Sequence, residues 1–219
     1  MTKTLAVAAD SSDAILDAAA LLFRRHGYAA TSVRDLARAA GILPGSLHYR
    51  YPSKEDVLVA LMERAIDRLI AAILDAISGE VDPLERVRLA IRAHLRMVLS
   101  GENGVYVLLY DWRSLSTATA QAVERQRARY ERFSDELISQ AAAAAPVRPS
   151  VDLLLLRRFG FGAVNWVAQW FDPRDGYTVD DIADHFWRYL AFGALESGSP
   201  PRVRKEETRA RTRRSTQPR

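Results

Sequence analysis

The chain has 219 residues, 48% of them hydrophobic, which is enough for one large domain or two small ones with a substantial core. It contains no cysteine, so disulfides and thiolate metal sites are excluded, as is usual for a cytoplasmic protein. No apolar run reaches the roughly 20 residues of a membrane span, and the apolar stretch at the start is too short for a signal peptide. We therefore expect no membrane association.

The net charge of +4 is unevenly distributed along the chain. Residues 200–219 carry eight basic and two acidic side chains, so this segment is +6 and the other 199 residues sum to −2. Its Pro-, Arg- and Thr-rich composition predicts a basic disordered tail over 198–219. We also expect a disordered arm over 1–10. The body of the protein is thus not uniformly basic.

The first predicted helix runs from about Ser12 to His26 and ends at Gly27. Residues 31–54, TSVRDLARAAGILPGSLHYRYPSK, then contain two short helix patterns joined by a tight turn. Gly41 closes the first of them, because glycine enters the left-handed conformation without a Cβ clash. Pro44 opens the second, a position that proline tolerates well, and Pro52 ends it. This arrangement predicts a helix-turn-helix, whose second helix reads the major groove of DNA.

The outward face of that second helix predicts the DNA contacts. Its first residues are small, so its positive N-terminal end can approach a phosphodiester chain closely. The polar side chains that follow can donate hydrogen bonds, and residues at helix starts, Thr31 and Lys54 among them, are expected to hold phosphate. The predicted DNA-binding residues are Thr31, Arg34, Pro44, Gly45, Ser46, His48, Tyr49, Arg50 and Lys54.

Residues 11–58 resemble the DNA-binding domain of the TetR family of bacterial repressors. The matching pieces are Gly27-Tyr28, Thr31 to Ala37, Ala40-Gly41-Ile42, Gly45-Ser46-Leu47 and Tyr51 to Glu55. His48 stands where the family usually has tyrosine, and Arg50 where histidine or tyrosine is common. The resemblance implies an all-α fold of about nine helices. A three-helix DNA-binding domain over 11–54 would precede a ligand-binding and dimerisation domain over 55–197.

Helical patterns continue through the second domain. Ser53, with Asp56 three residues on, caps a long helix that ends near Gly79. Further helices are expected over 83–99, 105–112, 117–145 and 151–171, and a last one is capped by Thr178. The segment 151–171 is apolar all round, which predicts burial on every side. The resemblance implies that the last two long helices form a homodimer, and Gly160 and Gly162 would then mark a close helix crossing.

The aromatic residues of the second half are the predicted effector site, although such residues are more often plain core. The set is Tyr106, Leu109, Tyr110, Arg113, Trp166, Gln169 and Trp170. The pattern Asn165-Trp166, Trp170 to Pro173, Gly176, Thr178 and Ile182 is similar to TetR repressors of fatty-acid and steroid catabolism. That similarity implies an acyl-CoA effector, whose phosphates Arg113 and Arg92 would meet.

Two alternatives remain open from the sequence. A multidrug-type regulator would bind cationic or hydrophobic drugs in an aromatic pocket, for which Asp111 is the available acid. A helical acyl-CoA-binding enzyme or carrier is the other. The four histidines form no metal-binding pattern, and no catalytic motif or cofactor loop is present, so we expect no enzyme, cofactor or metal. His94 lies near an apolar face and is expected to be a hydrogen-bonded core histidine. The expected partners are operator DNA, a second copy of the chain and a small molecule.

Overall fold

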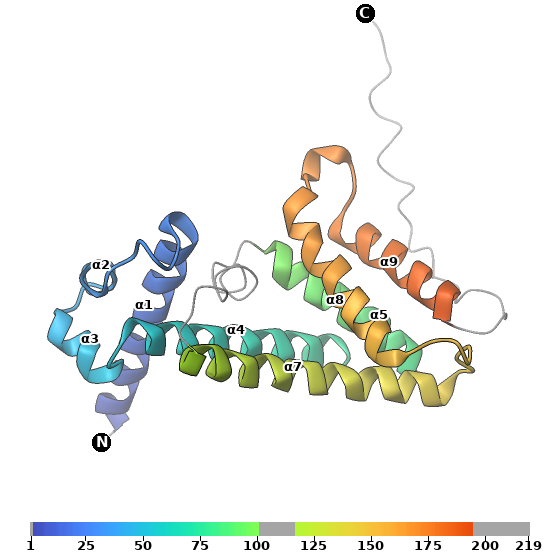
Figure 1. Cartoon of the computed structure of the whole chain (residues 1–219), viewed down its shortest axis with the longest axis horizontal. Coiled ribbons are helices and arrows are strands. Elements are labelled where there is room, and N and C mark those ends of the chain that lie inside the picture. Colours follow the sequence, from blue (N-terminus) through green and yellow to red (C-terminus); the bar gives the residue numbers. More distant parts are fainter. Residues whose placement is uncertain (1, 101–116, 195–219) are drawn as a thin grey trace, which may run out of the picture.

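The computed structural model describes residues 2–100 and 117–194, and over these ranges it contains eight α-helices and one short 3₁₀-helix. The bounds are α1 Thr2–His26, α2 Val33–Ala39, α3 Pro44–Arg50, α4 Lys54–Ala76, α5 Pro83–Leu99, α7 Thr117–Ala144, α8 Leu153–Trp170, η2 Pro173–Asp175 and α9 Val179–Ala194. Helices α1–α3 form a separate lobe at one end, and α4 leads from this lobe into the remaining helices (Figure 1). The predicted all-α architecture is confirmed.

Local sequence signals fix the starts and ends of the N-terminal helices. Ser32 caps α2 and Ser53 caps α4, each in a capping box with the aspartate three residues on. Gly41 has a φ of 69°, as expected for a glycine that ends α2 in the left-handed region. Pro44 is the first residue of α3. The predicted helix-turn-helix geometry therefore rests on interactions within a few residues of each turn.

The N-terminal lobe is held together by one hydrophobic core. Leu36 of α2 and Leu47 of α3 are fully buried against Phe23 of α1. The first turns of α4 contribute Leu58 and Met62 to the same core. Since fully burying such a side chain contributes about 1.5–3 kcal/mol, α4 is firmly joined to the helix-turn-helix formed by α2 and α3.

Helix α1 is longer than the sequence pattern predicted. It begins at Thr2, not at Ser12, so residues 2–10 continue the helix where a disordered arm was expected. The segment between them has no proline or glycine to break a helix and is rich in alanine, the best helix former. The predicted tail over 198–219 and the predicted helix over 105–112 lie outside the described residues.

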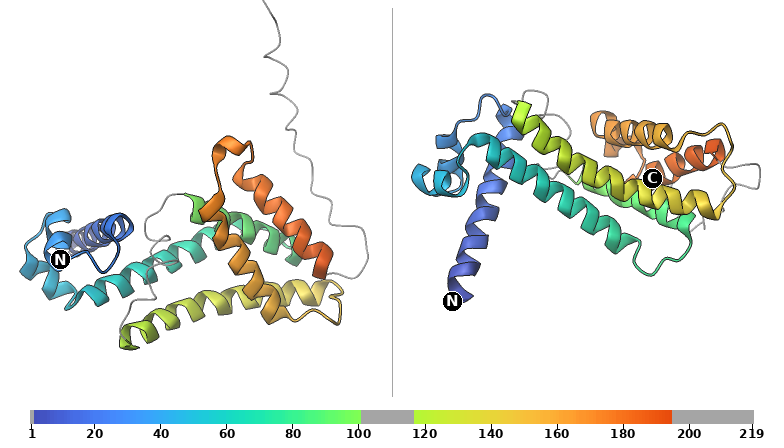
Figure 2. Two further views of the ribbon diagram at one scale, coloured as in Figure 1. Left: turned by 45° about the horizontal axis from the view of Figure 1, so that its top comes forward. Right: turned by 60° about the horizontal axis from the view of Figure 1, so that its bottom comes forward.

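The second domain is a bundle of the far part of α4 with α5, α7, α8 and α9. Helices α4 and α7 lie side by side along its length, while α8 and α9 pack on α5 (Figures 1 and 2). One core cluster joins α4, α5 and α7 around Ile73 and Leu137. A second joins α5, α8 and α9 around Leu95, Val164 and Ala183. None of the described helices is long and apolar enough to cross a membrane.

Candidate DNA-binding surface and ligand cavity

Most of the predicted DNA-binding residues lie on the outer face of α3. Pro44, Gly45, Ser46, His48 and Tyr49 are all exposed, and Tyr49 is 91% exposed. Between them, Leu47 is completely buried and anchors the helix on the core. Arg34 of α2 is exposed as well. Helix α3 thus presents small residues at its N-terminus and hydrogen-bonding side chains along one solvent-facing side.

Thr31 does not lie on this surface. It is only 3% exposed, and its hydroxyl donates a hydrogen bond of 2.9 Å to the carbonyl oxygen of Gly27. The side chain of Thr31 therefore closes the turn after α1. Thr31 was predicted to hold phosphate, but in this structure its hydroxyl is bonded to Gly27, and the exposed capping position of α2 belongs to the neighbouring Ser32.

Lys54 has partners within the protein that the sequence did not indicate. Its ammonium donates to the carbonyl oxygens of Tyr28 at 2.8 Å and Thr31 at 2.9 Å, and it lies 4.2 Å from the centre of the Tyr28 ring. Burial lowers the pKa of Lys54, and burial raises the pKa of Tyr28 to about 12. Lys54 thus ties the start of α4 to the turn after α1, and its contact with phosphate stays a prediction.

Arg50, at the end of α3, turns back toward α1. Its Nη1 donates a hydrogen bond of 2.7 Å to the hydroxyl of Ser12. The side chain is partly buried, in contrast to His48 and Tyr49 on the same helix. The structure therefore gives Arg50 a contact between helices where the sequence suggested a base contact.

A cavity lies between the helices of the second domain, with a volume of about 130 Å³. Helices α4, α5, α7, α8 and α9 all contribute to its walls. Most lining side chains are aliphatic or aromatic, such as Ile91, Phe161 and Phe186. The polar exceptions are His94, Tyr130, Ser134 and Arg157. This arrangement suits an apolar guest with few polar groups.

His94 is the centre of a hydrogen-bond network in the cavity wall. Its Nε2 lies 2.9 Å from the amide oxygen of Asn165, and its Nδ1 lies 2.6 Å from the hydroxyl of Tyr130. Since an amide oxygen only accepts, Nε2 carries the proton and Nδ1 accepts from Tyr130. Burial lowers the pKa of His94 and keeps it neutral, and burial raises the pKa of Tyr130. The network joins α5, α7 and α8.

Arg157 is the one buried cation among the cavity residues, at 5% exposure. Its guanidinium pairs with Asp135 at 2.7 Å and with Glu131 at 2.9 Å, both on α7. It also lies 5.6 Å from the centre of the Phe161 ring. Two carboxylates face this one guanidinium, so the cluster carries a formal charge of −1, but both acids are partly exposed and neither lines the cavity.

The predicted effector residues of α8 are not in this cavity. Trp166 and Trp170 are 63% and 51% exposed, and Gln169 is exposed beside them. The other predicted effector residues, Tyr106, Leu109, Tyr110 and Arg113, lie outside the described residues. The sequence did not predict Tyr130 and Arg157. Helix α7 is charged along its length and α8 is apolar on every side, so no pattern shows which single residue of each helix faces the cavity. His94 was found through the apolar face on which it lies.

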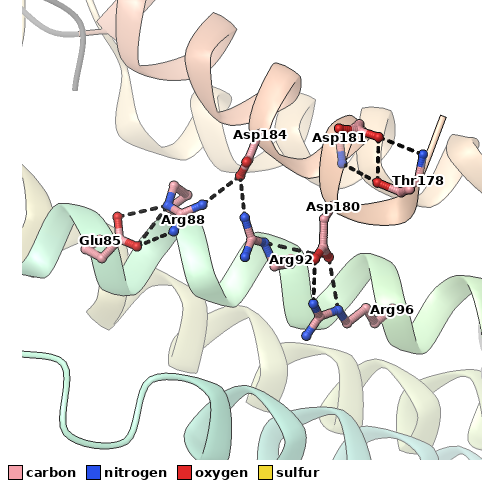
Figure 3. Close-up of polar contacts among 8 residues, drawn as sticks. All are labelled: Glu85, Arg88, Arg92, Arg96, Thr178, Asp180, Asp181 and Asp184. Atoms are coloured by element: carbon pink, nitrogen blue, oxygen red, sulfur yellow. Dashed lines mark hydrogen bonds and ion pairs between the residues drawn. The ribbon is translucent and has the colours of Figure 1, made fainter. Parts of the chain in front are cut away.

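Arg92, the other residue expected to meet CoA phosphates, belongs to a ladder of ion pairs between α5 and α9 (Figure 3). Arg88 and Arg92 share the carboxylate of Asp184, at 2.7 and 2.9 Å. Arg96 and Asp180 form the next pair at 2.7 Å, and Glu85 holds Arg88 from its own helix. The ladder fixes α9 along α5, and it satisfies the charge of Arg92.

Apolar side chains cover the outer face of α8 and α9. On α8 the exposed fractions are 72% for Phe159 and 63% for Trp166, and on α9 they are 74% for Tyr189 and 72% for Phe192. Helix α8 is therefore not buried on every side within one chain. Gly162 is also exposed on α8, whereas Gly160 is buried and faces Phe186 of α9. The two glycines do not mark one helix crossing.

Among the described residues, no group of three or more His, Asp or Glu side chains is arranged to hold a metal ion.

Comparisons with known families follow the division of the chain into two parts. A family model described as "Bacterial regulatory proteins, tetR family" matches residues 15–61. A second, described as "Tetracyclin repressor-like, C-terminal domain", matches residues 80–194. The chain belongs to the TetR family. The first match covers the α1–α3 lobe with the start of α4, and the second covers the domain that contains the cavity.

Relatives and solved structures are similar to most of the length of the chain. The repressor KstR2 of Mycobacterium tuberculosis is 27% identical over 84% of this chain and 92% of its own length. The structure of AibR in complex with isovaleryl coenzyme A and operator DNA is 27% identical, with a TM-score of 0.72, over 84% of this chain and all of that one. The structure of PfiT, named a superantigen, is 33% identical, with a TM-score of 0.73, over 86% and 97%.

Proposed function

We propose that this TetR-family protein is a homodimeric transcriptional repressor that binds a palindromic operator and is released by an acyl-CoA thioester. The observation that carries the proposal is the course of α4. Its first residue, Lys54, is bonded to the DNA-binding lobe, and its Ile73 lines the cavity. At 1.5 Å per residue, one rigid helix spans the roughly 29 Å between the two sites. The proposal includes no catalytic step and places the protein in the cytoplasm.

The outer face of α8 and α9 supports the homodimer. Apolar patches of this kind on a soluble protein mark interaction surfaces. Phe159 and Trp166 would pack against the same face of a second copy, since a two-fold interface is self-complementary. A dimer also supplies two reader helices for two half-sites roughly 34 Å apart.

On DNA, we assign different roles to the exposed residues. Gly45 and Ser46 lie at the N-terminus of α3 and would approach the phosphodiester backbone, with Arg34 as a second backbone contact. His48 and Tyr49 would reach base edges in the major groove. Lys54 and Arg50 would act indirectly, by holding the α3 helix in place.

The chemistry of the cavity supports a thioester over the other effectors. A free fatty acid would bring a carboxylate into an apolar space where the buried cation, Arg157, is already paired with two acids. A cationic drug would need an acid in the cavity wall, but Glu131 and Asp135 do not line the cavity, and the residue of this cluster that does is the cation Arg157. An acyl chain is uncharged, and its CoA part remains outside the apolar space. The relative AibR was crystallised with such a ligand and with operator DNA.

Release from DNA would follow from a change in the distance between the two α3 helices of the dimer. A ligand shifts the balance between two states only by its difference in affinity for them, and a change from 1:99 to 99:1 needs about 5.5 kcal/mol. Burying apolar surface contributes about 0.8 kcal/mol per methylene group, so seven methylene groups that are buried only in the released state would suffice. Helix α4 would transmit a displacement at the cavity to the α3 helix of the same subunit.

The test is operator binding titrated with CoA thioesters, the matching free acids, free CoA and a cationic dye. We expect release by one or more thioesters and by none of the others. The operator would be found first by footprinting, which should give a protected palindrome. Release by a free acid or by the dye, with no response to any thioester, would contradict the acyl-CoA assignment. The absence of any protected palindrome would contradict the repressor assignment as a whole.

A further inference from the structure

Gly160 is an unusual residue for its place in the fold. It lies in the middle of α8, where glycine costs about 1 kcal/mol relative to alanine. It is not among the glycines with positive φ, so its backbone conformation does not require glycine. Nor is it a point of close helix contact. A Cβ atom built there would have one neighbour within 4 Å, the Cζ of Phe186 at 3.8 Å, which is an ordinary van der Waals distance.

The position of Gly160 in the cavity wall gives a reason for a glycine that backbone conformation and helix contacts do not give. The residue is buried and lines the cavity together with Phe161, Val164 and Phe186. A side chain at this position would project into the space that a ligand occupies. We propose that Gly160 determines the size of the acyl group that the protein accepts, an inference that rests on the proposed function.

The dimensions of the cavity make this position decisive. A volume of about 130 Å³ is close to the roughly 150 Å³ of an engineered cavity that binds benzene. A methyl group at position 160 fits without displacing Phe186, since its distance of 3.8 Å is unstrained. The two further methyl groups of valine must either fill part of the cavity or move the Phe186 ring. Valine would therefore shorten the acyl chain that fits, while alanine would have a small effect.

The experiment compares Gly160→Ala and Gly160→Val with the unchanged protein. Dissociation constants are measured for CoA thioesters of increasing length, from acetyl to dodecanoyl, together with the melting temperature and operator affinity without thioester. We expect Gly160→Ala to melt at the same or a higher temperature. In Gly160→Val the longest thioester that the unchanged protein binds should weaken at least tenfold, and the shortest by less than threefold. Ala71→Val, at an exposed position of α4, serves as the control for added bulk; it should leave the thioester and operator affinities unchanged and lower only the melting temperature, because valine is a weaker helix former.

Each outcome decides the inference. A loss that is equal for every thioester, or no loss, would refute the role of Gly160 in size selection. If Gly160→Val does not fold, the inference is tested on the small loss that Gly160→Ala should show for the longest thioester but not for the shortest, and the absence of that loss refutes it. If the unchanged protein binds no thioester, the acyl-CoA assignment fails. The role in size selection is then tested with alkylbenzenes in a thermal-shift assay, where Gly160→Val should lose the larger ones first. Equal shifts in both proteins would overturn it.

Discussion

The contacts of Lys54 lead to a prediction that separates a structural lysine from a DNA-binding one. In Lys54→Met the aliphatic stem remains, but the ammonium that bonds Tyr28 and Thr31 is lost. Hydrogen bonds from a charged donor contribute about 1.5–3 kcal/mol, and a cation over an aromatic ring about 0.5–1 kcal/mol. Because the lysine is only partly buried, we expect a loss of about 2–3 kcal/mol. For a chain of this length that lowers the melting temperature by about 4–12 °C.

The assay is operator binding measured over a range of salt concentrations. Each phosphate contact contributes about −0.9 to the slope of log K against log salt. Lys54→Met should weaken operator binding because the α1–α3 lobe is less firmly held, and it should leave this slope unchanged. Arg34→Ala, at an exposed position of α2, should make the slope less steep by about 0.9 at an unchanged melting temperature. A less steep slope for Lys54→Met, at an unchanged melting temperature, would refute the structural role of Lys54.

Three further predictions concern the second domain. Asp184→Asn should lower the free energy of unfolding by about 2–3 kcal/mol, because it leaves two largely buried arginines without their shared carboxylate. Asp180→Asn should cost less than about 1 kcal/mol, because Asp180 pairs closely only with the 58% exposed Arg96 and lies 3.7 Å from Arg92, which keeps Asp184. Equal losses in urea denaturation would contradict this. Trp166→Glu should give a monomer in sedimentation because it puts a charge into the proposed dimer face, and a stable dimer would argue against that face. The pKa of His94 is below its ordinary value of 6.5, so the unfolded chain binds more protons and stability should fall as the pH drops below about 6.5. His94→Gln should flatten this fall and the exposed His26→Gln should not; the same profile in both variants would count against the assignment.

The sequence by itself determined the local architecture of the DNA-binding lobe. Capping boxes at Ser32 and Ser53, the left-handed Gly41 and the proline at the start of α3 act over three or four residues, and all are found in the structure. A buried Leu47 between exposed Ser46 and His48 also follows from helical periodicity. These features need no knowledge of distant residues. The TetR resemblance could be recognised from the same stretch.

Contacts between distant residues were decided by the tertiary structure alone. The partners of Lys54 are 23 to 26 residues away, so nothing near it in the sequence shows that its ammonium is already bonded. In α8 both the cavity side and the outer side are apolar. Periodicity can group Phe161 with Val164 and Phe159 with Trp166, but only the placement of α5, α7 and α9 decides which group lines the cavity. For the same reason Gly160, which reads in the sequence as a helix crossing, proves to be a position in the cavity wall.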